Sequence, residues 1–135
     1  STFKDAGKHM VFPEIISKEP LGPLVRQGDD QWADIGRWVL NALIVGEEMN
    51  ITKANVGSKA NGTKNPEVNR LLGTEGSIGK WLGLDAKWAV RAISANGNYA
   101  EIFEKYIGKN TPLGLARGQN ALYNKGGILY APPVR

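Results

Sequence analysis

The chain has 135 residues, of which 41% are hydrophobic and 22% charged, and this composition fits one folded domain and argues against intrinsic disorder. Its net charge of +4 comes from lysines and arginines scattered among thirteen acidic residues. A positive charge spread this thinly does not predict nucleic-acid binding. The chain has no cysteine, which excludes disulfides and thiolate metal sites. No apolar run approaches the roughly 20 residues that span a membrane.

Residues 1–28 are expected to form a leader, an extended segment and a hinge-like strand. Ser1–Met10 is polar and contains lysines, so it has no signal-peptide character. Met10–Ile16 is expected to be extended, with Pro13 confining it to a sheet edge or a bend. Ser17–Pro23 contains prolines and a glycine and predicts a crossover. Leu24–Gln27 then predicts a short strand, which needs a partner sheet for its backbone groups.

Residues 29–50 predict a long amphipathic helix that runs from about Asp30 to Met49. Gly28 supplies a turn before it, and Asp29 and Asp30 supply an N-cap. We expect Trp32 and Trp38 to contribute to core or interface packing. The apolar stripe that defines one face has three- and four-residue spacing and consists of Trp32, Ile35, Val39, Ala42 and Leu43.

Residues 51–65 are expected to form a mobile loop, because Met49–Asn65 is rich in Asn, Gly, Lys and Thr. Residues 66–135 are expected to form a helical extension with an extended tail. The first helix there has Asn65 as its cap, Pro66 in its first position and Gly73 beyond its end.

Two more helices are marked by their caps and by glycines. Asp85 is expected to cap the first and Gly97 to end it, with Trp88, Ala89, Ala92 and Ile93 facing inward. Asn98 is expected to cap the second, with Glu101 in the capping-box position and Gly108 at the end. Its predicted apolar face consists of Ile102, Phe103, Tyr106 and Ile107.

Few residues have the character of a catalytic or metal site, and the sequence predicts neither an enzyme nor a cofactor. His9 is the only histidine and has no companion at a spacing that would form a metal or nucleophile site. Glu47 and Glu48 are neighbours on a helix and diverge by about 100°, so they cannot both converge on one substrate bond. Gly76–Gly83 resembles a phosphate loop only superficially, since Lys80 is followed by Trp81.

Several stretches together resemble a known family. They are PEIISKEPLGPLVRQGDDQWADIGRWVLNALI, NPEVNRLLGTEGSIGKWLGLD, GNYAEIFEKYIG and PLGLARGQNALYNKGGILYAPPVR. Together they are similar to the C-terminal part of the general L-amino-acid periplasmic binding proteins of ABC transporters. The resemblance covers nearly the whole chain.

The resemblance implies a two-lobed α/β fold in which hinge strands join the lobes and an amino acid is clamped between them. Leu24, Val25, Arg26 and Gln27 are the hinge candidates, and the long helix would pack on the sheet of the first lobe. The residues that clamp the ligand lie upstream of every matched motif, so the resemblance assigns no ligand-binding residue here. Binding of an L-amino acid would then need an N-terminal portion that this chain does not contain.

The expected fold is therefore mostly α with minor β, as the C-terminal part of that two-lobed fold plus a helical extension. The expected function is the solute-binding component of an amino-acid ABC transporter in the periplasm, with the membrane permease as its partner. The alternative is a stand-alone helical oligomerisation or interaction module without ligand binding. If the resemblance holds, unpaired strand edges and an open helix face predict a homodimer or higher homo-oligomer, or else dependence on the missing upstream portion.

Overall fold

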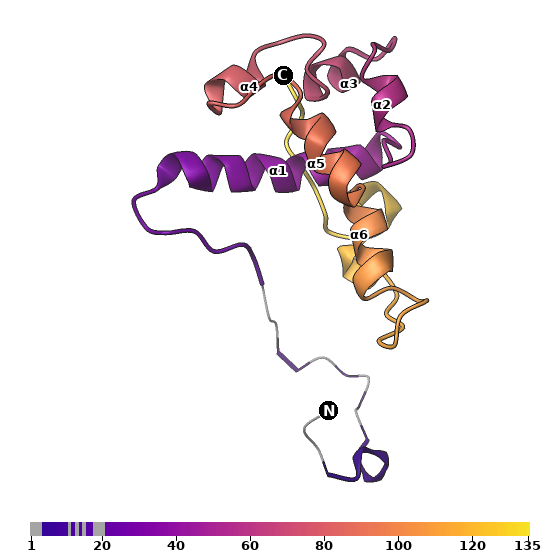
Figure 1. Cartoon of the computed structure of the whole chain (residues 1–135). Coiled ribbons are helices and arrows are strands. Elements are labelled where there is room, and N and C mark those ends of the chain that lie inside the picture. The colour runs from indigo at the N-terminus through magenta and orange to yellow at the C-terminus, as the bar shows by residue number, and fades with distance from the viewer. Residues whose placement is uncertain (1–3, 11, 13, 15, 18–20) are drawn as a thin grey trace.

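The computed structural model describes residues 4–10, 12, 14, 16–17 and 21–135 (Figure 1). The described residues are mostly helical, which confirms that part of the expected fold class. Their strand pairing is limited to an isolated parallel bridge between Leu122 and Leu129, less than expected. Among these residues, no helix is long and apolar enough to cross a membrane. The helices are η1 (Ala6–Lys8), α1 (Asp30–Glu48), α2 (Val56–Lys59), α3 (Pro66–Leu71), α4 (Ile78–Trp81), α5 (Trp88–Asn96), α6 (Tyr99–Tyr106), η2 (Gly118–Asn120) and η3 (Tyr123–Lys125).

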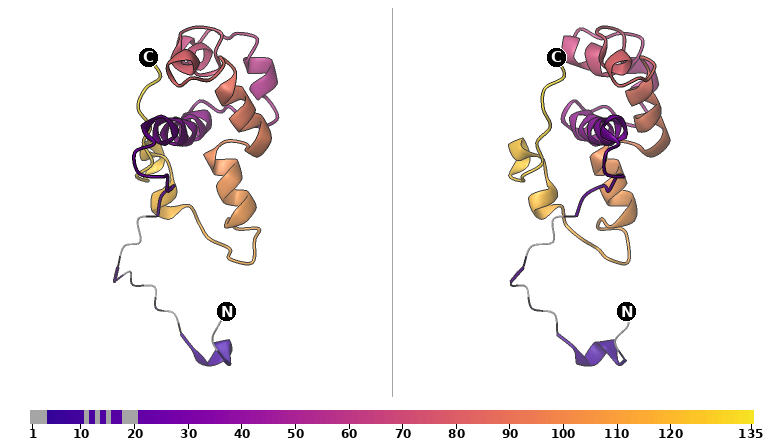
Figure 2. Two further views of the ribbon diagram at one scale, coloured as in Figure 1. Left: turned by 60° about the vertical axis from the view of Figure 1, so that its left-hand side comes forward. Right: turned by 90° about the vertical axis from the view of Figure 1, so that its left-hand side faces the viewer.

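Helix α1 forms at the predicted place, and α5 and α6 pack against it. Its N-cap is Asp29, whose Oδ1 accepts a hydrogen bond from the Trp32 N–H at 3.1 Å. The helix ends at Glu48, and Met49 is its C-cap. Helices α5 and α6 contact α1 on one side, whereas the C-terminal segment follows its other side (Figure 2).

The hydrophobic core surrounds the C-terminal half of α1. Gly46 permits the close approach of α5, since a Cβ there would lie 3.3 Å from Ile93 Cδ1. The N-terminal half of α1 is exposed or half-buried, and only Ile35, Trp38 and Val39 of this half pack in part against the core. The buried residues with the least exposed side chains are Ile51, Leu71, Leu72, Ile93, Leu122, Val45, Val56 and Val134.

The segment between α1 and α3 is more structured than a loop, because it contains α2. Ile51 and Val56 are buried and attach this segment to the core. Lys59 Nζ donates hydrogen bonds to the carbonyl oxygens of Met49 and Asn50, both at 3.1 Å. The positive ammonium thereby satisfies carbonyls at the negative end of α1. The expected mobility of this segment stays a prediction.

The caps of α3 and α6 agree with the sequence. Asn65 Oδ1 accepts from the Glu67 N–H at 2.9 Å, and Pro66 occupies the first position of α3. Asn98 and Glu101 form the predicted capping box of α6. Asn98 is also buried and donates through Nδ2 to the Ile51 carbonyl at 2.9 Å, so this cap joins α6 to the segment after α1.

The start of α5 and the face of α6 differ from the expectation. Helix α5 begins at Trp88 with Lys87 as its N-cap, and Asp85 instead accepts from the Lys87 N–H at 2.7 Å in the preceding turn. Lys87 Nζ donates to the carbonyls of Ala60 at 3.1 Å and Leu72 at 3.2 Å. A local sequence pattern cannot predict these tertiary contacts. Tyr106 is exposed rather than part of an apolar interface, because no described residue covers it at the end of α6.

The C-terminal segment is extended as predicted and closes the core. Val134 is buried, and its carbonyl accepts from Arg70 Nε at 2.7 Å while its N–H donates to Glu67 at 3.2 Å. Both partners belong to α3, so the tail is bound to a helix more than 60 residues earlier in the chain.

Candidate functional site

The hinge candidates Leu24–Gln27 lead directly into the N-terminus of α1 and do not form the predicted strand. Among the described residues they have no ladder partner, and the Leu24 side chain is 97% exposed. The physical reason is that a strand of this length is stable only within a sheet, and no sheet is present in the described part of the chain. In the described chain this segment is therefore extended and solvent-exposed, and its role as a hinge stays a prediction.

A tight turn connects this segment to α1. The Asp29 N–H donates to the Arg26 carbonyl at 3.3 Å, and Gly28 between them has φ = 82°. An L side chain is disfavoured in this left-handed conformation, so glycine is the residue that the turn requires. The turn sets the direction in which the extended segment leaves α1.

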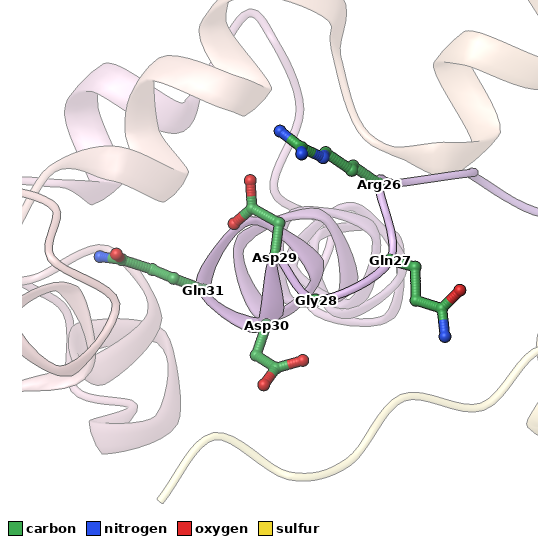
Figure 3. Close-up of a pocket in the computed structure, with 6 residues that line it drawn as sticks. All are labelled: Arg26, Gln27, Gly28, Asp29, Asp30 and Gln31. Carbon is green, nitrogen blue, oxygen red and sulfur yellow. The ribbon is translucent and has the colours of Figure 1, made fainter.

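An open hollow of about 490 Å³ surrounds this turn and is lined by Arg26, Gln27, Gly28, Asp29, Asp30 and Gln31. Figure 3 shows that their side chains point in different directions and do not converge on one point. Asp29 and Asp30 lie at the positive end of the α1 dipole, which favours their negative charge. Asp29 is already engaged as the cap. The hollow therefore lacks the enclosed, converging charges that would hold an amino acid.

A second hollow, of about 290 Å³, lies between the extended segment and the exposed half of α1. Pro23 and Val25 contribute one wall, and Ala33, Gly36 and Leu40 contribute the other. Trp32 on the same half of the helix is 57% exposed, so its predicted packing is not achieved within the described chain. Apolar groups at this end of α1 thus remain in contact with water.

The acidic pair Glu47–Glu48 is divided between two environments, as the helical geometry predicted. Glu47 is buried and accepts from Arg117 Nη2 at 2.8 Å. Glu48 accepts from the Tyr123 hydroxyl at 3.2 Å, and this hydrogen bond is the main reason that the pKa of Tyr123 lies above its usual value. No sequence signal pointed to Arg117, because it meets Glu47 only through the fold.

The remaining candidates show no assembled chemistry. His9 lies in an exposed position, with Nδ1 3.3 Å from the Asp5 carbonyl oxygen. Asp85 is paired with Arg91, and the hydrogen bond from that guanidinium lowers the carboxyl pKa. In the described ranges, no group of His, Asp or Glu side chains is arranged to hold a metal ion.

Comparison with known proteins gives the family. The chain is 56% identical to the glutamate/glutamine/aspartate/asparagine-binding protein BztA of Rhodobacter capsulatus over 135 residues, which are 100% of this chain and 40% of that protein. It is 57% identical to the general L-amino acid-binding periplasmic protein AapJ of Rhizobium johnstonii over 136 residues, covering 99% of this chain and 40% of that protein. The chain corresponds to the C-terminal portion of an amino-acid ABC transporter periplasmic binding protein.

A solved structure agrees with this assignment. A periplasmic binding protein of an ABC transporter from Brucella ovis, with glutathione bound, superimposes with a TM-score of 0.89 at 53% identity. The match covers 96% of this chain and 40% of that chain. No family model matches. The chain thus spans about two fifths of the length of the family members that it matches.

Proposed function

We propose that this chain is part of the solute-binding component of an ABC transporter, which captures an amino acid in the periplasm and delivers it to a membrane permease. The observation that carries the proposal is 56–57% identity to two amino-acid-binding proteins over 99–100% of this chain. Identity at this level over nearly the whole chain supports a role shared with those relatives.

The exposed half of α1 supports a particular place for this chain within the whole binding protein. Trp32 is exposed in the described chain, and an apolar hollow on the same half of α1 is open to water. Leaving such apolar surface in contact with water costs free energy. The relatives contain more chain than the part matched here. We propose that this additional chain forms the sheet of a first lobe that covers the N-terminal half of α1.

The segment Leu24–Gln27 is proposed as the hinge between the lobes. Its backbone is not part of a ladder, so its dihedral angles can change without breaking hydrogen bonds of a sheet. The neighbouring turn at Gly28 is anchored by the cap of α1, which would keep the motion within the extended segment.

Ligand binding is proposed to need both lobes. A zwitterionic amino acid requires a cation for its carboxylate and an acid for its ammonium group in a largely enclosed site. The hollow at the start of α1 is open, and its side chains diverge (Figure 3). Clamp residues from the additional chain of the family would complete the site.

A chimera tests the proposal. The matched portion of the Rhodobacter capsulatus relative would be replaced by this chain, and binding of glutamate, glutamine, aspartate and asparagine would be measured by calorimetry. We expect the chimera to bind at least one of them and this chain alone to bind none. A ligand that binds also raises the melting temperature by mass action, which supplies a second readout.

The intact relative is the positive control, and a chimera that carries an unrelated helical domain is the negative control. A folded chimera that binds no amino acid would contradict the proposed role. Binding by the isolated chain would instead contradict the requirement for two lobes.

A further inference from the structure

A solvent-open cavity of about 210 Å³ lies on the side of α1 that faces the C-terminal segment. Its walls include the carboxylates of Glu48 and Glu67 and the rings of Tyr123 and Tyr130. Pockets for drug-sized ligands usually enclose about 300–1,000 Å³. This cavity is therefore sized for one small group rather than for a whole metabolite.

The cavity carries two carboxylates, each of which accepts one hydrogen bond: Glu48 from the Tyr123 hydroxyl and Glu67 from the Val134 N–H. Among the described residues, neither Glu48 nor Glu67 takes part in an ion pair. Glu48 is the last residue of α1, whose final turn contains no basic residue. A carboxylate at the negative end of a helix is disfavoured by the dipole. The Lys59 ammonium at this end binds the carbonyls of Met49 and Asn50 and forms no ion pair with Glu48, so a further cation beside Glu48 would stabilise that carboxylate.

The aromatic rings add a second feature that favours a cation. Tyr123 and Tyr130 form an edge-to-face pair with their centroids 5.3 Å apart. Both side chains are exposed, and Tyr130 donates no hydrogen bond to any described residue. The face of an aromatic ring attracts a positive charge that approaches within about 6 Å.

The neighbouring carboxylate of α1, Glu47, already holds a guanidinium. Arg117 pairs with Glu47 at 2.8 Å, and its guanidinium carbon lies 5.2 Å from the centre of the Phe103 ring and 5.5 Å from that of Tyr99. One carboxylate of α1 and two aromatic rings therefore surround Arg117. Glu48, the next residue, lines the cavity with Tyr123 and Tyr130, accepts a hydrogen bond from the Tyr123 hydroxyl and forms no ion pair with a cation of the described chain.

We propose that this cavity binds a guanidinium group. The planar fork of a guanidinium matches a carboxylate in a bidentate pair and stacks on aromatic rings, whereas an ammonium group is a compact, strongly hydrated charge. Glu48 supplies the carboxylate and Glu67 adds negative charge. Because the two tyrosine rings are nearly perpendicular, one ring would stack on the flat face of the group and the other would border it. The site is distinct from the proposed amino-acid clamp between lobes and does not depend on it.

The guanidinium could belong to a free solute or to an arginine of another protein, and two probes distinguish these sources. The probes are agmatine and a glycine-flanked arginine peptide with blocked ends, each titrated into the complete 135-residue chain. Amide chemical shifts locate the binding site. The peptide with citrulline in place of arginine is the neutral control of the same shape.

We expect shift changes confined to the residues around the cavity, weaker binding at higher salt and no binding of the citrulline peptide. Equal affinity for agmatine and the peptide indicates that the site recognises the guanidinium group alone, as in a free solute. Tighter binding of the peptide indicates an arginine of another protein. If neither probe binds, if citrulline binds equally well, or if the shifts map elsewhere, the proposal is overturned.

Variants assign the contribution of each wall. Tyr130→Ala should weaken binding about two- to fivefold through the loss of a cation–ring contact. Glu48→Gln should weaken it to a similar or greater extent, because it removes the partner charge. The matched controls are Tyr106→Ala and Glu104→Gln, which change exposed residues of α6 away from the cavity and should leave the affinity unchanged. Equal effects of the cavity variants and their controls would refute the assignment.

Discussion

Replacing Arg117 by methionine should destabilise the protein strongly, because it leaves the buried carboxylate of Glu47 without a partner. Glu47 is only 6% exposed, and the Arg117 side chain is 19% exposed. Removing one member of a buried ion pair typically costs about 3–5 kcal/mol. The guanidinium also contacts the rings of Phe103 and Tyr99, and losing these cation–ring contacts adds about 0.5–1 kcal/mol. We expect a total near 3 kcal/mol, since Arg117 retains some contact with water.

The assay is urea unfolding followed by circular dichroism, with the midpoint and slope compared between variants. Glu47→Gln alone should cost about 1 kcal/mol, because the glutamine carbonyl still accepts a hydrogen bond and Arg117 keeps its bonds to the Asn120 carbonyl. In the double variant most of the Arg117→Met penalty should disappear, which gives a coupling energy of about 1–3 kcal/mol.

The matched control is Arg37→Met, which breaks the exposed pair with Asp34. Exposed pairs of this kind contribute about 0–1 kcal/mol, so the control should shift the midpoint little. A cost for Arg117→Met no greater than that of the control, or strictly additive costs in the double variant, would refute the view that burial makes this ion pair indispensable.

Four further predictions concern other parts of the chain. Gly73→Ala should lower the free energy of unfolding in a thermal melt by at least the roughly 1–3 kcal/mol that a left-handed backbone costs a non-glycine residue, since Gly73 has φ = 69°. The clash adds to this cost, because a Cβ would lie 1.8 Å from the Ala86 carbonyl oxygen. A change near zero would mean that the turn rearranges freely. Glu48→Gln should lower the pKa of Tyr123 toward its usual value, since the carboxylate hydrogen bond raises it, and NMR titration of labelled tyrosine would show an unchanged pKa if this cause is wrong. Amides of Met49–Asn65 should exchange faster than those of the buried half of α1, although α2 lies within this segment; equal protection would contradict the predicted mobility. The exposed half of α1 should promote self-association of this chain, so sedimentation equilibrium that shows a monomer at all concentrations would contradict the expected oligomer.

Local signals in the sequence determined the helical elements well. Asp29, Asn65 and Asn98 are caps because their short side chains accept hydrogen bonds from the N–H groups two or three residues ahead, a relation contained within one turn of chain. The family, too, was visible in the sequence, since it depends on the order of residues alone. The prediction that Asp85 caps α5 was wrong, because the Lys87 side chain is fixed by the carbonyls of Ala60 and Leu72 at the ends of two other helices.

Only the tertiary structure decided what each exposed or charged residue meets. Leu24–Gln27 has the composition of a strand, but a strand forms only where another strand supplies its hydrogen bonds, and the described chain supplies none. Trp32 belongs to the same stripe as Ala42, yet only the latter is covered, because α5 and α6 cross the C-terminal half of α1. Likewise, Glu47 and Glu48 are neighbours in sequence, but one meets an arginine from 70 residues away and the other a tyrosine from 75 residues away. Caps and helix periodicity act over one or two turns, whereas burial and ion pairing depend on which distant segments the fold brings together.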